Sequence, residues 1–277
     1  MNITQSDHKI LMCCFGRILL LAAAFFLGSV AGKIEHSARS APVSGSILSA
    51  SENWGLSFPE EGKLPTANAS IEDLKQYAAY YAQDTEEKIL YLTFDCGYEN
   101  GFTPKILDVL KKEKVPAAFF VTKPFIREDP DLVKRMKKEG HVVGNHTVHH
   151  KSMPTVSDRD NKQELIDCAE YCKKTTGYDM DMFMRPPMGE YSEHTLALTK
   201  KLGYKTIFWS MAYVDFNVNS QPGKDYVVHH FEENYHNGAI PLMHNVSQSN
   251  AEALETVIKN MKAKGFEFRS LKKLPDY

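Results

Sequence analysis

An apolar run that ends in a carboxylic acid and a thiol constrains the fold of this chain most strongly. Residues 89–94 are β-branched, aromatic and apolar, which is typical of a strand covered on both faces. Asp95 and Cys96 follow directly, and Gly97 ends the strand before an amphipathic helix pattern begins. An acid at this place either caps the next turn or belongs to an active site. The ends of the other strands decide between the two interpretations.

The rest of the chain alternates between strand-like and helix-like segments. Repeated alternation with short loops predicts an α/β fold of parallel strands and crossover helices, as an open sheet or a barrel. About seven such units suit a slightly small barrel. The expected strands are 89–94, 117–122, 141–145, 183–184, 205–209, 239–243 and 266–268, and the expected helices are 130–138, 158–174, 193–202, 225–234 and 251–264.

Residues 1–32 carry the pattern of an export signal. Residues 18–32 are almost wholly apolar, and Lys9 and Arg17 precede them. Their length fits either a cleaved signal peptide or a signal anchor, and the basic flank directs the remainder out of the cytoplasm. We therefore expect an exported protein at the cell wall or the extracytoplasmic face, secreted or anchored in the membrane through residues 18–32.

Residues 33–85 are expected to form a linker and a short docking segment. The stretch is rich in Ser, Ala and Pro, Ser70 opens a short helix with capping chemistry, and Trp54 begins an apolar clip. The main domain is then expected at 86–277.

A formal net charge of -2 gives no reason to expect nucleic acid as a partner. The pattern does not indicate an oligomeric state.

Three cysteines lie in the expected main domain. Cys168 and Cys172 are four residues apart on a helical stretch and share a face, so core packing is favoured over a strained intrahelical disulfide. Cys96 is then left single, which is unusual in an exported protein. Its thiolate is therefore a candidate ligand for a metal ion.

Polar clusters follow five of the expected strands. Because the carboxyl ends of parallel strands meet on one rim, these clusters favour a shared active site over separate turn caps. The clusters are Asp95-Cys96, residues 146–150, residues 185–189, Asp215-Phe216 and residues 242–244.

His146 and His150 are the candidate metal ligands within this rim. Two imidazoles on one short segment suit zinc or a related divalent ion, although a surface histidine cluster is the plainer alternative. Either Asp95 or Cys96 would supply a third ligand. A divalent ion with open positions activates water, so the cluster predicts metal-assisted hydrolysis of an acyl bond.

The remaining rim residues fit the proton transfers of such a hydrolysis. Asp95 can accept a proton from water, and His244, expected across the rim, can donate one to a leaving group. Asp215 can hold that imidazole in one tautomer, and Arg185 can pair with Asp95. Taken singly, Arg185 and Asp215 read as ordinary salt-bridge residues; within the set they read as functional.

From about Lys88 to Leu274 the chain resembles the NodB-like polysaccharide deacetylases, with that family's five motifs in order. The resemblance implies an irregular (β/α)7-type barrel and makes 86–277 the catalytic domain. It further implies Asp95 as general base, Cys96, His146 and His150 as ligands of a divalent metal, Arg185 in a groove wall, and Asp215 and His244 at the positions of the acid motif. The family has Asp where Cys96 stands.

The first motif, through Gly101, and Asn53-Trp54-Gly55 resemble more narrowly the N-acetylmuramic acid deacetylases of sporulating bacteria. This likeness implies peptidoglycan glycan strands as the partner and muramic δ-lactam of spore cortex as the later product. The expected ion is zinc, because it suits imidazole and thiolate ligands. Two alternatives remain: a deacetylase of N-acetylglucosamine or chitooligosaccharides, and a non-catalytic glycan-binding module whose site decayed at Cys96.

Overall fold

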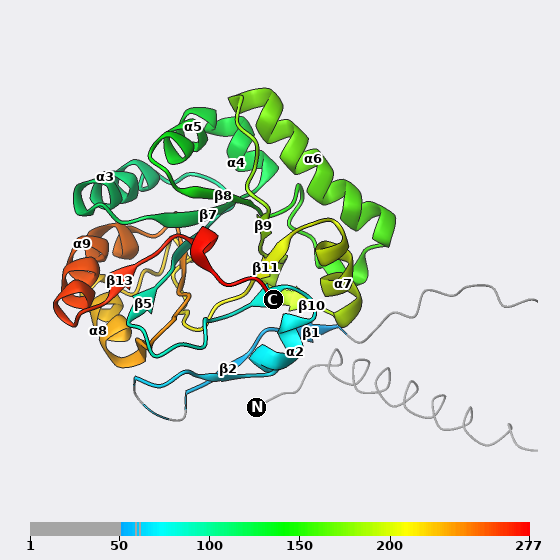
Figure 1. The fold of residues 1–277 in the computed structure, drawn as a ribbon. Coiled ribbons are helices and arrows are strands. Elements are labelled where there is room, and N and C mark those ends of the chain that lie inside the picture. The colour runs from blue at the N-terminus through cyan, green and yellow to red at the C-terminus, as the bar shows by residue number, and fades with distance from the viewer. Residues whose placement is uncertain (1–50, 59, 61) are drawn as a thin grey trace, which may run out of the picture. The chain divides into compact units, whose positions relative to one another are not determined.

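A curled sheet of seven parallel strands forms the centre of the molecule, as the computed structural model of residues 51–58, 60 and 62–277 shows (Figure 1). Each neighbouring pair in this sheet is parallel, as expected for strands joined by crossover helices. In spatial order the strands are β12 (Leu242–His244), β6 (Leu92–Cys96), β7 (Ala117–Val121), β8 (Val142–Asn145), β9 (Phe183–Met184), β11 (Lys205–Ile207) and β4 (Ala79–Tyr80).

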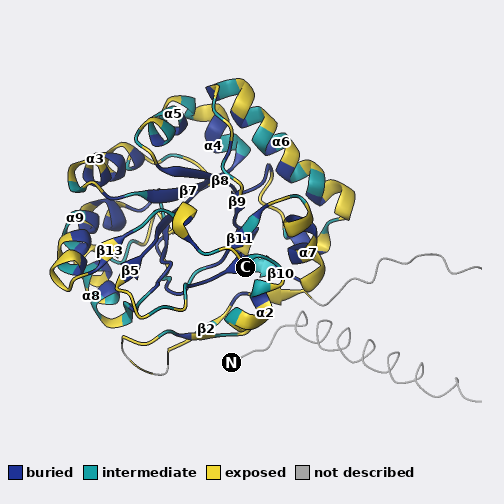
Figure 2. Cartoon of the chain, in the orientation of Figure 1, coloured by how far each residue is buried: buried dark blue, intermediate teal, exposed yellow. Residues whose placement is uncertain are grey.

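Helices pack around the outside of the curled sheet, with their buried faces towards the strands and their exposed faces towards solvent (Figure 2). They are α2 (Ile71–Lys75), α3 (Thr103–Glu113), α4 (Lys123–Glu128), α5 (Pro130–Lys138), α6 (Asp158–Thr176), α7 (Glu193–Lys201), α8 (Lys224–Asn234) and α9 (Gln248–Ala263), with short 3-10 turns η1 (Met153–Thr155), η2 (Pro187–Gly189) and η3 (Leu271–Lys273).

Three small two-stranded sheets complete the fold. They pair β1 (Glu52–Asn53) with β10 (Glu190–Tyr191), β2 (Leu56–Ser57) with β3 (Thr66–Ala67), and β13 (Glu267–Phe268) with β5 (Ile89–Leu90). The expected strand 89–94 is therefore two strands, β5 and β6, and the expected strand 266–268 pairs with β5 rather than with the main sheet. The expected α/β architecture is confirmed, as a curled half-barrel.

The predicted domain boundary at residue 86 needs correction. Strand β4, at residues 79–80, is the edge strand of the main sheet and pairs in parallel with β11. The sheet thus begins before the boundary that composition indicated, because this short strand lies in the stretch whose composition is typical of a linker. The helix after Ser70 does form, and Ser70 and Asp73 make the expected capping box.

The segment around Trp54 docks on the domain, as its apolar pattern predicts. Trp54 is buried, its ring stacks on Phe208 with centroids 4.3 Å apart, and its indole Nε1 donates to the carbonyl of Trp209 at 2.9 Å. Its backbone N–H donates to the carbonyl of Gly189 at 3.0 Å. Gly189 has a φ of +69°, and a side chain there would collide with Trp209, so this close approach requires glycine.

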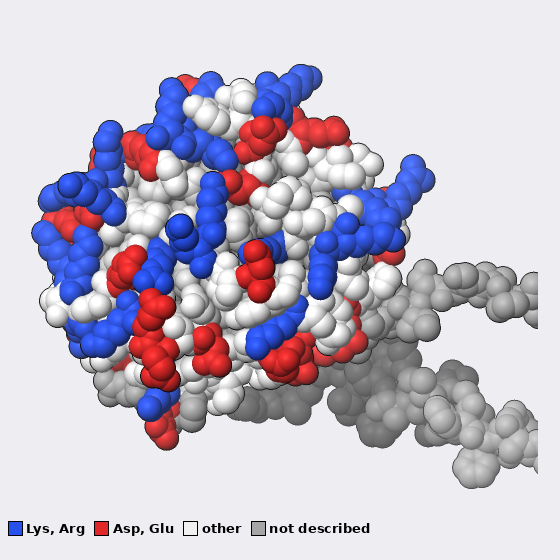
Figure 3. Space-filling model, viewed as in Figure 1, with Lys and Arg blue, Asp and Glu red and all other residues white. Residues whose placement is uncertain are grey.

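Residues 1–50 lie outside the described part of the chain, and with them the predicted signal or anchor and the first part of the linker. Among the residues that are described, no helix has the length and apolar character needed to cross a membrane. Acidic and basic side chains are interspersed on the face seen in Figure 3, in keeping with the small net charge.

Successive side chains of β6 and β7 point to opposite sides of the sheet, which separates the site from the outer core. Phe94 and Phe119 stack, with ring centroids 5.1 Å apart, in the core between the sheet and the helices. Phe120 belongs to a second core on the other side of the sheet. Asp95 is the register partner of Phe120, so its side chain lies on the inner side.

Candidate active site

The carboxyl ends of the strands surround a cleft of about 680 Å³. Asp95, His146, His150 and His244 line it together with apolar and aromatic residues, among them Trp209. The expectation that polar residues from separate strands meet on one rim is therefore confirmed for these four. A mostly apolar wall with a few convergent polar groups is the usual construction of a small-molecule site.

Asp95 forms a buried ion pair with Arg185. The Arg185 Nη1 donates to Asp95 Oδ1 at 2.8 Å, and the guanidinium is completely buried. Burial alone would raise the pKa of Asp95, but the charge and hydrogen bond of Arg185, together with the nearby His146 and His244, lower the pKa below its ordinary value. The carboxylate therefore remains ionised and can accept a proton.

The guanidinium of Arg185 is fixed by more than this pair. Its Nε donates to the carbonyl of Ile207 at 3.0 Å, and its Nη2 donates to Thr93 Oγ1 at 2.8 Å and to the carbonyl of Phe208 at 3.1 Å. Its charged plane also lies 4.4 Å from the ring centroid of Phe120. Arg185 thus links three strands and holds the Asp95 carboxylate in one orientation.

His146 and His150 present their Nε2 atoms to each other. These atoms are 3.2 Å apart, and the His146 Nδ1 lies 2.8 Å from the carbonyl of Arg185, so the Nδ1 carries the hydrogen and the Nε2 keeps its lone pair. Burial lowers the pKa of His146 to about 4 and that of His150 below its ordinary value, so both imidazoles are neutral at pH 7.

This pair fits a divalent ion. Two nitrogens at about 2.0–2.1 Å from one tetrahedral ion would be roughly 3.3 Å apart, close to the observed separation. The Asp95 Oδ2 lies 3.6 Å from the His146 Nε2 and is the nearest carboxylate oxygen. In residues 51–58, 60 and 62–277 no group of three or more His, Cys, Asp and Glu side chains is arranged to hold a metal. The described residues therefore provide two nitrogen ligands for a divalent ion, from His146 and His150, and the adjacent carboxylate of Asp95.

The loop that carries the two histidines is strained and held by Glu164. Thr147 and His150 adopt positive φ angles of 67° and 53°. The Glu164 carboxylate, on α6, accepts hydrogen bonds from the backbone N–H groups of Val148 at 2.9 Å and His149 at 2.7 Å. The side chain of His149 turns outwards to the same carboxylate, so it does not join the site.

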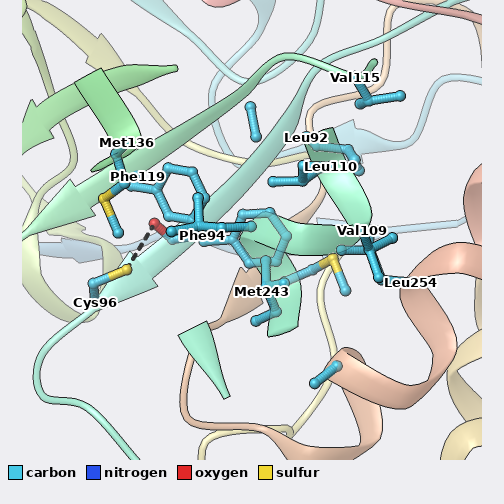
Figure 4. Close-up of a cluster of buried hydrophobic side chains, with 14 of the residues drawn as sticks. Leu92, Phe94, Cys96, Val109, Leu110, Val115, Phe119, Met136, Met243 and Leu254 are labelled. Atoms are coloured by element: carbon cyan, nitrogen blue, oxygen red, sulfur yellow. Dashed lines mark hydrogen bonds between the residues drawn. The ribbon is translucent and has the colours of Figure 1, made fainter. Parts of the chain in front are cut away.

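Cys96 does not reach the site, which corrects its assignment as a metal ligand. It directly follows Asp95 on β6, so its side chain points to the opposite side of the sheet. Its sulfur lies among Phe94, Phe119 and Met136 in the outer hydrophobic core (Figure 4). Burial raises the pKa of this thiol well above its ordinary value, so it remains protonated rather than a thiolate.

The two helix cysteines pack in the same core. Cys168 and Cys172 are both buried and free, which confirms the expectation of core packing over a disulfide.

His244 and Asp215 form the second polar pair of the cleft. The His244 Nδ1 lies 2.6 Å from Asp215 Oδ1, so the carboxylate holds the hydrogen on Nδ1 and leaves Nε2 for the cleft. Burial alone would lower the pKa of His244, but the hydrogen bond and charge of Asp215 raise it above its ordinary value. His244 is the register partner of Asp95 on the adjacent strand, so it stands beside the base rather than across the rim.

Two further residues around Asp215 were not found from the sequence. The Asn250 Nδ2 donates to Asp215 Oδ2 at 2.6 Å, and the Tyr213 hydroxyl donates to Asn250 Oδ1 at 2.6 Å. Neither residue belongs to the clusters at the strand ends. The only signal in the sequence is the Ser-x-x-Asn helix start that follows β12, which by itself indicates a cap.

Comparison with known proteins agrees with this arrangement. Residues 82–207 match the family described as polysaccharide deacetylase. The chain is 46% identical over 220 residues to the peptidoglycan-N-acetylmuramic acid deacetylase PdaA of Bacillus subtilis, covering 79% of this chain and 84% of that protein. A solved structure of Bacillus subtilis PdaA, described as a family 4 carbohydrate esterase, superimposes with a TM-score of 0.78 at 45% identity, covering 81% of this chain and 96% of that one.

Two more distant relatives differ in what they are described to do. A peptidoglycan-N-acetylglucosamine deacetylase of Bacillus cereus is 31% identical over 69% of this chain and 90% of its own length. A structure from Bacillus anthracis described as a pseudoenzyme of carbohydrate esterase family 4 has a TM-score of 0.66 at 26% identity, covering 71% of this chain and 68% of that one. The chemistry of each member therefore depends on its own site residues.

We expect Asp215→Asn to move the alkaline limb of the pH profile of kcat/KM to lower pH. His244 must be protonated to donate, so activity falls as the pH rises through its pKa, which Asp215 raises. The measurement is kcat/KM for deacetylation against pH in the wild type and the variant, with the exposed Asp131→Asn as control. Coincident profiles for wild type and Asp215→Asn would contradict the assignment of His244 as the acid.

We expect Cys96→Ala to leave the metal content of the purified protein unchanged. The thiol lies in the hydrophobic core, so its loss should lower the free energy of unfolding by about 1 kcal/mol and leave the histidine pair intact. His150→Ala is the matched variant that should lose the metal. Elemental analysis of the three proteins checks this; loss of metal in Cys96→Ala would restore the sulfur as a ligand.

Proposed function

Because the chain belongs to the polysaccharide deacetylase family, we propose that it removes the acetyl group from N-acetylmuramic acid in peptidoglycan. The observation that carries the chemistry is the cleft in which the ionised Asp95 and the Asp215-supported His244 lie side by side near the histidine pair. The substrate assignment is supported by the identity with PdaA over most of that protein's length.

The proposed reaction is hydrolysis of the acetamide C–N bond. Asp95 takes a proton from the attacking water as the new C–O bond forms, and Arg185 keeps this carboxylate oriented and ionised beforehand. His244 then gives its Nε2 proton to the departing nitrogen as the C–N bond breaks. The products are acetate and a free amine, and solvent returns the two side chains to their starting protonation states.

Members of this family depend in general on a metal ion, and here His146 and His150 would hold it. When bound, a divalent ion supplies Lewis-acid activation of the carbonyl and the water. We propose zinc, because two neutral imidazole nitrogens are ligands that zinc favours. Because Cys96 faces the hydrophobic core, Asp95 or water would complete the coordination.

A second substrate class also has support. The relative from Bacillus cereus is described as a peptidoglycan-N-acetylglucosamine deacetylase, and its match with this chain spans 90% of its length. N-acetylglucosamine differs from N-acetylmuramic acid in lacking the lactyl ether, so both sugars present the same acetamide to Asp95 and His244. The chemistry proposed above would be unchanged, and only the fit of the sugar distinguishes the two.

We propose further that the enzyme works outside the cytoplasmic membrane, secreted or anchored through residues 18–32. The apolar segment with its basic flank supports this, and peptidoglycan strands are found there. In a sporulating cell the freed amine would lead to muramic δ-lactam of the cortex. Cell fractionation of the full chain, compared with a chain lacking residues 1–32, tests the location.

The test of the substrate is release of acetate from glycan strands stripped of peptide. We expect release from muramic residues by the wild-type protein and none by Asp95→Asn, which keeps the shape of the side chain but loses the base. Chitin oligomers are the comparison substrate. Release from chitin oligomers alone would transfer the proposal to N-acetylglucosamine, and glycan binding without release in both proteins would support the non-catalytic module.

A further inference from the structure

We propose that Asn250 is a positioning residue that holds the Asp215 carboxylate in the orientation which supports His244, and that Tyr213 fixes the orientation of the Asn250 amide. The inference deepens the proposed reaction and rests on the role given there to His244. Asn250 is completely buried and is absent from the residues that line the cleft, so it acts through Asp215 and does not touch substrate.

The local sequence places Asn250 at the carboxylate. Helix α9 begins directly after β12, and the Ser247 side chain accepts a hydrogen bond from the Asn250 backbone N–H at 3.2 Å. This cap puts Asn250 in the first turn of α9, facing back to the strand that carries His244. The Asn250 Nδ2 lies 2.6 Å from Asp215 Oδ2 and 3.1 Å from the carbonyl of His244. The Asn250 amide therefore links the backbone of His244 to the Asp215 carboxylate that supports the His244 imidazole.

The hydrogen bonds to Asp215 show what this amide contributes. Oδ1 is bonded to the His244 imidazole at 2.6 Å, and Oδ2 accepts the His244 backbone N–H at 2.7 Å. The Asn250 amide supplies the second donor to Oδ2. The other two donors to this carboxylate belong to His244 itself. Asn250 therefore anchors Asp215 independently of His244, the residue that Asp215 must orient.

Tyr213 determines which end of the amide faces Asp215. Its hydroxyl lies 2.6 Å from Asn250 Oδ1, and because a phenol hydrogen can be donated to an amide oxygen, this contact directs the NH2 group to Asp215. A reversed amide would set its oxygen against the carboxylate. Burial raises the pKa of Tyr213 well above its ordinary value, so the hydroxyl keeps its hydrogen.

The experiment compares two asparagines on the same helix. Asn250→Leu removes the donor to Asp215, and Asn260→Leu removes a similar bond, from its Nδ2 to Glu232 Oε1 at 2.8 Å, which joins α9 to α8. With whichever acetamide glycan the wild type hydrolyses, we expect Asn250→Leu to lower kcat roughly 10- to 100-fold with KM nearly unchanged, the size of effect for a hydrogen bond to a charged group. Asn260→Leu should retain the wild-type kcat.

A double-mutant cycle separates positioning from general stability. In an Asp215→Ala background, Asn250→Leu should cause no further fall in kcat, because the group it orients is gone. An equal fall in both backgrounds, or a fall shared by Asn260→Leu, would assign Asn250 a structural role and overturn the proposal.

Two measurements keep the proposal open to refutation if Asn250→Leu does not fold or the substrate assignment fails. Tyr213→Phe keeps the ring and should lower kcat by roughly 3- to 10-fold, again only while Asp215 is present. Independently of turnover, the downfield proton resonance of the His244–Asp215 hydrogen bond should be lost or shifted in Asn250→Leu or Tyr213→Phe and kept in Asn260→Leu. An unchanged resonance in the first two variants would overturn the inference even in a protein that releases no acetate from muramic residues.

Discussion

The buried ion pair between Arg185 and Asp95 is the interaction on which the rest of the site depends. It joins the end of β9 to the end of β6 across the inner side of the sheet, and the remaining donors of Arg185 bind the Thr93 hydroxyl and the carbonyls of Ile207 and Phe208. Removal of one partner from a buried pair costs roughly 3–5 kcal/mol, because the other charge is left unpaired. The same pair keeps the base ionised in a place where burial alone would favour its protonated form.

The parallel sheet explains how a small number of residues from separate strands can build the site. Strand register sets His244 beside Asp95, and the loops after β8 and β9 bring His146 and Arg185 to the same rim. Each polar side chain is in turn held by a neighbour: His146 by the carbonyl of Arg185, and His244 by Asp215. The Trp54 segment supports the rim from outside, where it packs against Gly189 and Trp209. The polar side chains of the site are therefore oriented before any ligand arrives.

The sequence predicted the order of strands and helices and most of the rim, because long apolar strands and their polar ends leave clear patterns. It could not predict that Cys96 faces the core. Asp95 and Cys96 point to opposite sides only if the strand continues through Cys96, and the sequence pattern does not show where the strand ends. Strand β4 lies in a stretch whose composition is typical of a linker, and Asn250 reaches Asp215 only through the placement of α9. Such contacts between distant segments depend on tertiary packing, which local patterns do not report.

The central claim is that Arg185 keeps Asp95 ionised as the base of the reaction. The most direct measurement is a carbon-13 NMR titration of the Asp95 carboxyl in the purified protein, assigned by its absence in Asp95→Asn. The account predicts a pKa below the ordinary value for an aspartic acid, since Arg185, with the nearby histidines, more than offsets the effect of burial. A pKa at or above the ordinary value would contradict it, because the ion pair would then fail to hold the base ready.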